Sequence, residues 1–513
     1  MNSSLSRKPW FIVLLPLFFV WHGWVEHAGF LSLKSVLPLF LTWTAAAVIL
    51  WTGFRWLLKD SLKAALMAAF CMGFYLFFGA VYDFLKAYAP WKFIYRYSVL
   101  LAAFLLLAIV LFFYLRRSRH SFHKPVLFLN SLLLLYILFD TATLVWKYGK
   151  GAPSQTVAAG HLSGRKIADS LAKPDIYLLL FDEYSSNSAL KERFGFNNSL
   201  LDTFLHAQGF HLQPHSRSNY GETSFSMASA LDMDFLPWYD PMKPATHEDY
   251  THCASLIKNN KVMQFLQHNG YSILNYSIFD LANHPAPVNQ RWLSIDARLL
   301  TEGTLLPRLC REFEGSIAQY TLLRKILPVS SYQEQMENND RCIKGVLDEA
   351  AKKSAGPRFV YGHFLLPHFP YFRDKAGQIL PDSIVYGVMK ETIPPDQHYL
   401  EYVQYTNTEI RRLIGTIREK DPAAVIIFMS DHGYRWRAGE PNAEWLFRNQ
   451  NAVCIPGKEY GAFYDSLTNV NQFRVIFNTL FHQQYPLLKD SVLLQSILPA
   501  TKQNPNTAYD PLR

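Results

Sequence analysis

The sequence predicts two parts of different fold class: a bundle of five transmembrane helices, then an α/β domain with a mostly parallel sheet and helices on both faces. Two observations carry this prediction. Apolar residues are concentrated before about residue 150, whereas short apolar runs alternate with helical patterns after residue 174. The chain has 513 residues, which exceeds one ordinary hydrophobic core, so at least two domains are expected.

Five apolar segments each approach the ~20 residues that a helix needs to cross a bilayer. They cover residues 10–30, 35–58, 62–85, 94–115 and 125–146. The first is too long, and too closely followed by others, for a cleaved signal peptide. Asp83 and Asp140 lie at or near segment ends, and we interpret both as carboxylates at the membrane interface.

Basic residues orient these segments. They precede the first segment and fill the loops between the second and third and between the fourth and fifth, so they fall on one side of the membrane. The positive-inside rule makes that side cytoplasmic, and five crossings then leave everything after Lys147 outside. The residues are Arg7, Lys8, Arg55, Lys59, Lys63, Arg116, Arg117, Arg119 and Lys124, against Lys86, Lys92 and Arg96 in the opposite loop.

The polar, small-residue stretch 149–173 predicts a flexible linker. It separates the anchor, residues 1–148, from the α/β domain, residues 174–490, and residues 491–513 form a C-terminal tail. Residues 285–340 are less regular and are interpreted as an insertion. Its amphipathic part, Leu299–Ile317, is open to two interpretations: a domain-packing helix, or a helix on the membrane surface.

Strands and helices alternate along the α/β domain. We expect strands at 175–181, 209–212, 271–276, 358–364, 424–430 and 452–455. We expect helices at 198–208, 223–231, 259–269, 340–353, 397–419 and 469–481.

Charge and cysteine content exclude several functions. The formal net charge is +9, but lysine and arginine are scattered without a basic stripe, so nucleic-acid binding is not predicted. The five cysteines include no CxxC pair, which argues against a zinc ribbon or a thioredoxin-like site. A Cys310–Cys342 disulfide is compatible with an extracytoplasmic domain, although sequence does not determine the pairing.

Chemically reactive side chains follow three of the expected strands. Because the carboxyl ends of parallel strands meet at one edge of a sheet, we expect these side chains to lie together. They are Asp182 and Glu183 after strand 175–181, His363 and His368 at or after strand 358–364, and Asp431 and His432 after strand 424–430.

Thr223 begins the expected helix 223–231 after the loop that starts at Ser218. Alone, Thr223 is typical of a helix N-cap, Asp182 of a turn and His363 of a buried core. Two carboxylates, two or three histidines and a hydroxyl at one sheet edge instead favour a metal site. Carboxylate oxygens and imidazole nitrogens suit zinc, manganese or a related cation.

A metal ion beside Thr223 would lower the pKa of its hydroxyl and prepare the oxygen to attack a phosphate or sulfate ester. Backbone N–H groups at the start of helix 223–231 would bind the oxygens of that ester. His368 could protonate the leaving alcohol or hold an oxygen. Asn219 and Arg435 are candidates for further oxygen contacts. The expected product is a phospho-threonine, resolved by a second alcohol or by water.

Four motifs in this order resemble the sulfatase-like branch of the alkaline phosphatase superfamily. They are Pro174–Tyr184, Ser218–Thr223, His363–Pro370 and Ser430–Gly433. Five spans before an extracytoplasmic domain resemble, within that branch, the lipoteichoic acid synthase and phosphoethanolamine transferase group. The resemblance covers about residues 174–485, and the anchor is similar in architecture only.

The resemblance implies roles for the matching positions. Asp182, Asp431 and His432 stand at metal-ligand positions, and Thr223 stands at the nucleophile position, which also contacts the metal. His368 matches a substrate-binding histidine.

His363 precedes His368 by the spacing seen in phosphoethanolamine transferases, and both it and Glu183 are candidates for substrate or second-metal contacts. Many relatives carry a small residue at the position of Glu183. Thr223 is followed by Ser224–Met227, without the proline and arginine of a formylglycine sulfatase. This departure counts against sulfate-ester hydrolysis.

The leading hypothesis is a metal-dependent extracytoplasmic phosphotransferase of the bacterial cytoplasmic (inner) membrane. It would move phosphoglycerol or phosphoethanolamine from a membrane phospholipid to an envelope glycan or lipid through phospho-Thr223. The alternatives are a hydrolase of sulfate or phosphate esters and a non-catalytic, membrane-anchored envelope assembly module. The expected cofactor is one or two divalent cations, zinc or manganese ahead of calcium or magnesium, and neither nucleotide nor nucleic acid is an expected partner.

Overall fold

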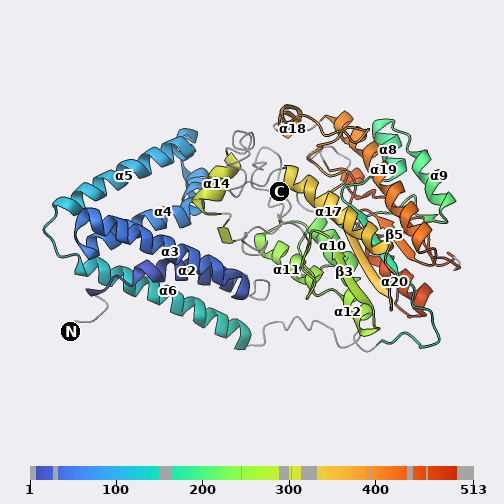
Figure 1. The fold of residues 1–513 in the computed structure, drawn as a ribbon, viewed down its shortest axis with the longest axis horizontal. Helices are drawn as coiled ribbons and strands as arrows, with labels where there is room; N and C mark the ends of the chain where they lie inside the picture. Colours follow the sequence, from blue (N-terminus) through green and yellow to red (C-terminus); the bar gives the residue numbers. More distant parts are fainter. Residues whose placement is uncertain are drawn as a thin grey trace. The chain divides into compact units, whose positions relative to one another are not determined.

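The computed structural model describes residues 7–26, 33–149, 165–243, 245–287, 300–301, 303–312, 332–389, 391, 395–435, 443–457 and 460–493. The chain divides into two compact units. Unit 1 comprises Met1–Gln155 and Gln290–Ser331, and unit 2 comprises Thr156–Asn289 and Tyr332–Arg513 (Figure 1). A segment from the middle of the sequence therefore belongs to the N-terminal unit.

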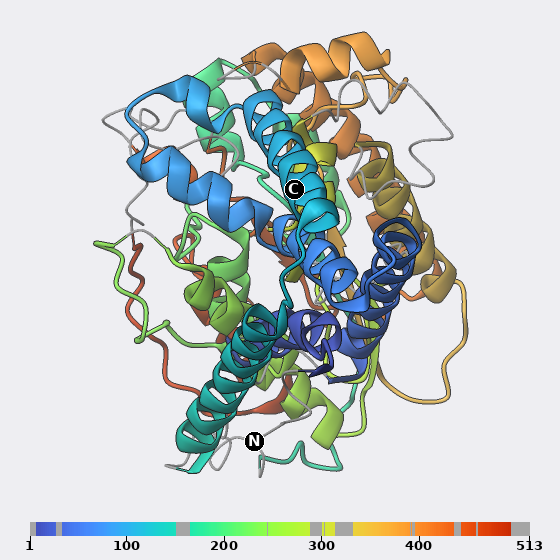
Figure 2. The same cartoon turned by 90° about the vertical axis from the view of Figure 1, so that its left-hand side faces the viewer.

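Unit 1 is built from apolar helices, coloured blue to teal in Figure 2. They are α2 (Phe11–Glu26), α3 (Leu33–Leu58), α4 (Ser61–Tyr88), α5 (Tyr97–Arg117) and α6 (His123–Gly149), with the short 3-10 helix η1 (Lys92–Tyr95) before α5. Four of them, α3 to α6, are long and apolar enough to cross a membrane.

The first expected span is shorter than predicted. Helix α2 has 16 residues, which corresponds to ~24 Å at 1.5 Å per residue, against a hydrocarbon core of ~30 Å. Residues 27–30 of that expected span lie outside the described residues. The structure thus supports four spanning helices and one short apolar helix.

The two acidic residues of these helices have specific partners. Asp140 is 6% exposed, and both of its carboxylate oxygens lie 3.2 Å from Nδ1 of His22. Asp83 accepts hydrogen bonds of 3.3 and 2.6 Å from the guanidinium of Arg308. Asp140 is therefore buried against His22 rather than solvent-exposed, and its interfacial position stays a prediction.

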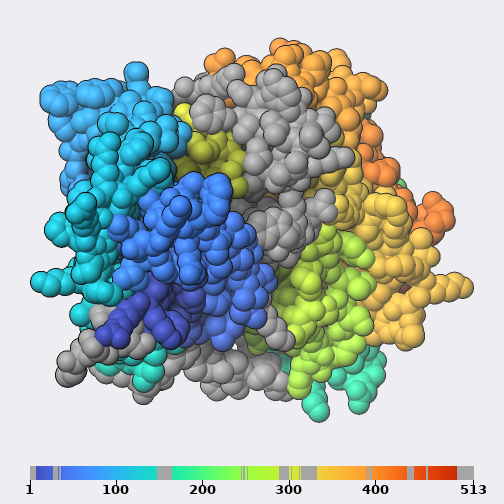
Figure 3. All heavy atoms as spheres, turned by 60° about the vertical axis from the view of Figure 1, so that its left-hand side comes forward, coloured from blue at the N-terminus to red at the C-terminus, as the bar shows by residue number. Residues whose placement is uncertain are grey.

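Helix α14 (Leu305–Glu312) packs against α4 within unit 1, and its yellow-green atoms are visible in Figure 3. The N–H of Gly79 donates a 2.7 Å hydrogen bond to the carbonyl of Gly303. A Cβ atom at Gly79 would lie 2.4 Å from that carbonyl oxygen, so a glycine is needed for this contact. Of the expected amphipathic stretch Leu299–Ile317, residue 299, residue 302 and residues 313–317 lie outside the described part of the chain.

Unit 2 contains a six-stranded mixed sheet in the order β2-β6-β5-β1-β4-β3. The strands are β1 (Ile176–Phe181), β2 (His211–Leu212), β3 (Ser272–Tyr276), β4 (Arg358–Phe364), β5 (Val425–Met429) and β6 (Asn451–Cys454). Strands β3, β4, β1 and β5 pair in parallel. The sheet is not wholly parallel, because β6 runs antiparallel to both β5 and β2.

Helices cover both faces of this sheet (Figure 1). Side chains alternate along β1, so Leu178 and Leu180 pack into one core while Leu179 and Phe181 pack into the other. The first core includes residues of α10 (Thr223–Asp232), α11 (His247–Lys258), α12 (Lys261–His268) and α20 (Asn469–Phe481). The second includes residues of α8 (Asn187–Phe194), α9 (Ser199–Ala207), α17 (Tyr332–Ala350), α18 (Asp382–Met389) and α19 (Asp396–Lys420).

Several local expectations differ from the structure. Helix α17 begins at Tyr332 rather than residue 340, and helices α8, α11 and α18 were not expected. Among the described residues, neither Cys310 nor Cys342 is in a disulfide, so the Cys310–Cys342 pairing that the sequence left open is not present in the structure. Part of the expected linker, residues 150–164, and part of the expected tail, residues 494–513, lie outside the described residues. Ile167, at the other end of that linker, is 3% exposed and packs in a core of unit 2.

Candidate active site

Adjacent parallel strands bring the expected residues together. Strands β4, β1 and β5 are neighbours in the sheet, and their carboxyl ends carry His363, Asp182 and Asp431. His363 is paired in register with Leu180 of β1, two residues before Asp182. The N–H of Glu183 donates a 3.0 Å hydrogen bond to Oδ1 of Asp431, which joins the two strand exits.

Thr223 is the first residue of α10 and is 4% exposed. The N-cap residue is Glu222, whose side chain makes no capping hydrogen bond. Because Thr223 follows the N-cap residue, its hydroxyl is not used to cap the helix. Its Oγ1 atom instead lies 3.4 Å from Oδ2 of Asp182 and 3.4 Å from Nε2 of His432.

Three residues at this point can hold a metal ion. Asp182, Asp431 and His432 are fully buried, and one ligand atom from each lies within 4.8 Å of the others. Nδ1 of His432 is 2.7 Å from the carbonyl oxygen of Gly433. Because a carbonyl only accepts, Nδ1 carries the hydrogen, and the lone pair of the neutral ring is on Nε2.

That lone pair faces carboxylates. Nε2 of His432 lies 3.3 Å from Oδ2 of Asp431 and 3.9 Å from Oδ1 of Asp182. A lone pair and a carboxylate oxygen cannot hydrogen-bond without a proton, whereas a cation between them would bind both. Burial acts to raise the pKa of Asp431, but positive charge on a protonated His432 or His363, together with the Thr223 hydroxyl, holds this pKa below its usual value. Positive charge at this point therefore stabilises the carboxylate.

His363 is a second imidazole with an available nitrogen. It is fully buried, and its Nε2 lies 3.5 Å from Oδ2 of Asp182. Among the described residues this nitrogen has no hydrogen-bond partner. Burial lowers the pKa of His363 to about 4, so the ring is neutral at physiological pH. A neutral imidazole is the form that binds a metal ion.

The local charge also fits a cation. Asp182, Glu183 and Asp431 are all 0% exposed, and burying carboxylates together is costly unless positive charge compensates them. Glu183 has a left-handed backbone with φ 62, which is strained for a residue with a side chain. This conformation accompanies the 3.1 Å bond that its Oε1 accepts from the N–H of Arg435.

His368 and Arg435 form a separate group beside this cluster. Nε2 of His368 lies 2.6 Å from a guanidinium nitrogen of Arg435 and 4.0 Å from Oε2 of Glu183. Nδ1 of His368 contacts the carbonyl oxygen of Phe369. In this arrangement the ring donates from Nδ1 and accepts from Arg435 at Nε2.

The side chain of Asn219, a candidate for contacts to substrate oxygens, binds two backbone groups. Its side-chain nitrogen donates to the carbonyl of Ser491 at 2.9 Å, and its side-chain oxygen accepts from the N–H of Val470 at 2.8 Å. Asn219 thus holds the loop before Thr223 in place. Sequence reasoning did not single out Glu222, whose Oε2 accepts from the Tyr250 hydroxyl at 3.1 Å and lies 4.0 Å from Arg435.

Gly433 allows a close approach of two backbones. A Cβ atom there would lie 2.3 Å from the carbonyl oxygen of Trp445, at the 3-10 helix η2 (Ala443–Phe447). The N–H of Gly433 donates a 2.7 Å hydrogen bond to the carbonyl of Leu446. This contact directs the chain away from the sheet immediately after His432.

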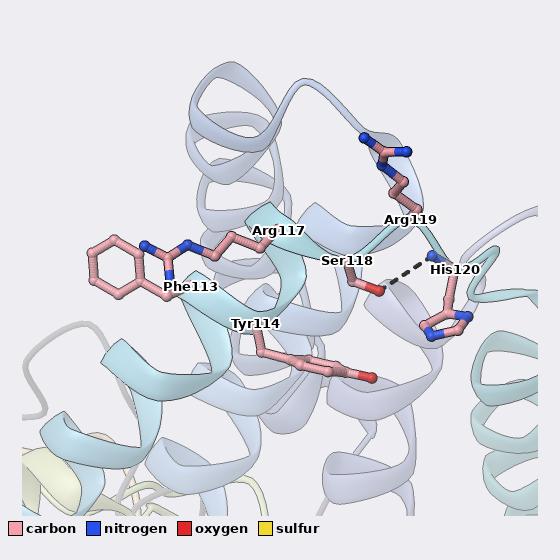
Figure 4. Close-up of a pocket in the computed structure, with 6 residues that line it drawn as sticks. All are labelled: Phe113, Tyr114, Arg117, Ser118, Arg119 and His120. Carbon is pink, nitrogen blue, oxygen red and sulfur yellow. Dashed lines mark hydrogen bonds between the residues drawn. The ribbon is translucent and has the colours of Figure 1, made fainter.

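A shallow cavity of about 360 Å³ lies in unit 1, at the end of α5. Its polar lining comes from Arg117, Ser118, Arg119 and His120. Figure 4 shows that the two arginines and the histidine point in different directions. They do not converge on one point, in contrast to the residues around Thr223.

Comparisons with known proteins identify the family of this chain. No curated protein matches the chain at a significant level. Among solved structures, the chain is similar to the C-terminal periplasmic domain of EptC from Escherichia coli, with 10% identity over 62% of this chain and 83% of that chain and a TM-score of 0.37. It is also similar to the integral membrane protein lipooligosaccharide phosphoethanolamine transferase A of Neisseria meningitidis, with 13% identity over 94% of this chain and 96% of that chain and a TM-score of 0.36. The sulfatase family matches residues 203–485, more than half of the sequence, and the chain therefore belongs to the sulfatase family of enzymes.

Proposed function

We propose that this enzyme is a metal-dependent phosphotransferase that moves a phospho-alcohol group, phosphoglycerol or phosphoethanolamine, from a membrane phospholipid to an envelope glycan or lipid. The observation that carries this proposal is the position of Thr223. Its hydroxyl oxygen lies 3.4 Å from both Asp182 and His432, two of the three residues that can hold a metal ion. This position supports a nucleophile role for the Thr223 hydroxyl rather than a helix-capping role.

Asp182, Asp431 and His432 would hold the metal, with His363 beside Asp182 as a further ligand candidate. A divalent cation bound there, zinc or manganese by the ligand types, supplies Lewis acidity that favours ionised Thr223 and neutralises phosphate oxygens. The three buried carboxylates described above support a cation as part of the functional site.

Different residues of the chain would then carry out the separate steps of the reaction. The Thr223 oxygen forms a bond to phosphorus while the bond from phosphorus to the diacylglycerol oxygen breaks. Once Arg435 moves from His368 onto the phosphate, Nε2 of His368 would take up the proton that Thr223 releases. His368 would then give this proton to the diacylglycerol oxygen, so that diacylglycerol leaves as the neutral alcohol. A hydroxyl of the acceptor would next attack phosphorus and give its proton to His368 while the bond from phosphorus to the Thr223 oxygen breaks. That proton would then return to the Thr223 oxygen.

The membrane unit supports a lipid donor. Helices α3 to α6 are long and apolar enough to span a bilayer, and we propose that α2 makes a fifth crossing. The basic residues before α2 and in the α3–α4 and α5–α6 turns would face the cytoplasm. Unit 2 would then lie on the outer side of a bacterial inner membrane, where phospholipid is an available phosphoryl donor.

Intact-mass measurement of the full-length protein tests the proposal. We expect wild-type protein incubated with phosphatidylethanolamine or phosphatidylglycerol vesicles to gain the mass of one phospho-alcohol group, and the mass names the group. Thr223→Ala should gain none while keeping its membrane insertion and thermal unfolding. An adduct of equal yield on Thr223→Ala would exclude the assigned nucleophile. If water rather than an added glycan or lipid acceptor receives the phospho-alcohol group, so that only free phospho-alcohol is released, the hydrolase alternative is favoured.

A further inference from the structure

The turn that carries Asp431 and His432 leaves the sheet, so its backbone loses the partners that a strand provides. Strand β5 ends at Met429, and the next two residues are Ser430 and Asp431. Their carbonyl groups are buried with those residues, and a buried carbonyl needs a hydrogen-bond donor. The donors here are side chains from three other parts of unit 2: α10, the segment before β6, and α20.

Three side chains supply these donors, and each is at most 1% exposed: Ser226, Asn449 and Asn469. The carbonyl of Ser430 accepts from Asn449 at 2.6 Å and from Asn469 at 3.2 Å. The carbonyl of Asp431 accepts from the Ser226 hydroxyl at 2.6 Å and from Asn469 at 3.1 Å. Asn449 also donates to the side-chain oxygen of Asn469 at 3.0 Å.

We infer that Ser226, Asn449 and Asn469 are positioning residues that fix the metal-ligand pair Asp431–His432 relative to the nucleophile Thr223. Ser226 lies on α10, three residues after Thr223, and therefore almost one helical turn away. Its hydrogen bond to Asp431 connects the helix of the nucleophile directly to the ligand turn. Asn469, the first residue of α20, holds that turn from a second helix. None of the three side chains is among the atoms that would touch the substrate.

This inference rests on the metal site of the proposed function and adds residues that neither the family resemblance nor the ligand geometry identifies. Polar partners that orient metal ligands typically change metal affinity by about 10–100-fold when they are removed. A network with only a stabilising role would instead affect unfolding without a specific effect on metal binding.

The chain provides a matched control on the same helix. Asn471 is fully buried and also makes hydrogen bonds, donating to the carbonyl of Leu488 at 2.8 Å and to Asp490 at 3.1 Å. It also accepts from the N–H of Leu488 at 2.9 Å. Asn471→Ala therefore removes a comparable set of buried bonds, but none of them reaches Asp431 or Thr223.

The experiment compares Asn469→Ala with Asn471→Ala in the full-length, detergent-solubilised protein. Calorimetric titration with Zn²⁺ and with Mn²⁺ measures affinity, and thermal unfolding of the apo protein measures stability. We expect Asn469→Ala to weaken metal binding by roughly 10–100-fold and Asn471→Ala to leave it within about twofold at a similar or larger loss of stability. Ser226→Ala removes a single hydroxyl. If Asn469→Ala does not fold, the metal affinity of Ser226→Ala is compared with that of Asn471→Ala instead.

Equal affinities in wild type, Asn469→Ala and Ser226→Ala would overturn the inference, as would a loss of affinity in Asn471→Ala as large as that in Asn469→Ala. Metal binding is read without turnover, so a wild-type protein that binds metal but forms no phospho-adduct contradicts the proposed transfer and leaves this inference standing. A wild-type protein that binds neither ion overturns both.

Discussion

Nε2 of His432 lies 3.4 Å from Oγ1 of Thr223, although the two residues come from different strand–helix connections of unit 2. The distance is set by two structural features: the parallel pairing of β1 with β5, and the bond from Ser226 of α10 to the Asp431 carbonyl. A nitrogen lone pair and a nucleophile oxygen this close can share one cation. Changes at these two residues should therefore separate metal binding from chemistry.

His432→Ala should lose the metal. Removal of the imidazole leaves Asp182 and Asp431 of the three-residue ligand group, with His363 as a further candidate. A zinc site that loses one of its ligands binds the ion more weakly. Metal content of the purified protein, measured by elemental mass spectrometry, should fall at least tenfold. His206→Ala, at an exposed position on α9, is the control. Equal metal content in the two variants would contradict the ligand assignment.

His368→Ala should keep the metal and lose turnover. His368 contacts Arg435, Glu183 and the carbonyl of Phe369, and it is not a member of the ligand group Asp182, Asp431 and His432. Loss of a proton donor to a leaving alcohol typically reduces the rate by about 10²–10⁴-fold. We expect that reduction in the rate of phospho-Thr223 formation, followed by intact mass. A His368→Ala protein without metal would place this residue in the metal site instead.

The sequence was sufficient for the parts of the fold that depend on local pattern. Each strand of the central four, β3, β4, β1 and β5, is a short run rich in apolar residues, and each was expected within one or two residues of its observed ends. The convergence of Asp182, His363 and Asp431 followed from the rule that parallel strands share one carboxyl edge. The candidate site could therefore be assembled before any distance was known.

Long-range packing could not be predicted in this way. Helix α14 packs against α4, and nearby Gly79 meets Gly303. This contact joins segments more than two hundred positions apart, which no local pattern encodes. In the sequence, Ser226 and Asn469 look like ordinary helix residues. A network of buried side-chain hydrogen bonds leaves no periodic pattern from which their role could be predicted. Asn219 was expected to contact substrate, yet its amide is committed to Val470 and Ser491.

Gly433→Ala should destabilise unit 2. The added Cβ would lie 2.3 Å from the carbonyl oxygen of Trp445 and 2.9 Å from that of Arg448, and backbone atoms cannot move aside without breaking the bond from Gly433 to Leu446. Forcing a methyl group into such a contact costs about 1–3 kcal/mol or more. Gly415→Ala, inside α19 with no atom within 4 Å of its Cβ, should instead stabilise the protein by about 0.5–1 kcal/mol. Thermal unfolding of both variants measures the difference, and similar melting temperatures would refute the close contact.

Gly79→Ala should release α14 from α4. The added Cβ would lie 2.4 Å from the carbonyl oxygen of Gly303, which should lengthen or break the 2.7 Å hydrogen bond between these residues. Cys310 on α14 is buried, with 2% exposure, and is not in a disulfide, so its accessibility to an alkylating reagent reports the release. A destabilisation of ~1.4 kcal/mol, within the range for overpacking, would raise the open population about tenfold. Alkylation of Cys310 in detergent-solubilised protein, followed by peptide mass spectrometry, should accelerate by that factor. Gly73→Ala on the same helix has no atom within 4 Å of its Cβ and should leave the alkylation rate unchanged; an equal rate in both variants would show that α14 does not depend on the Gly79 contact.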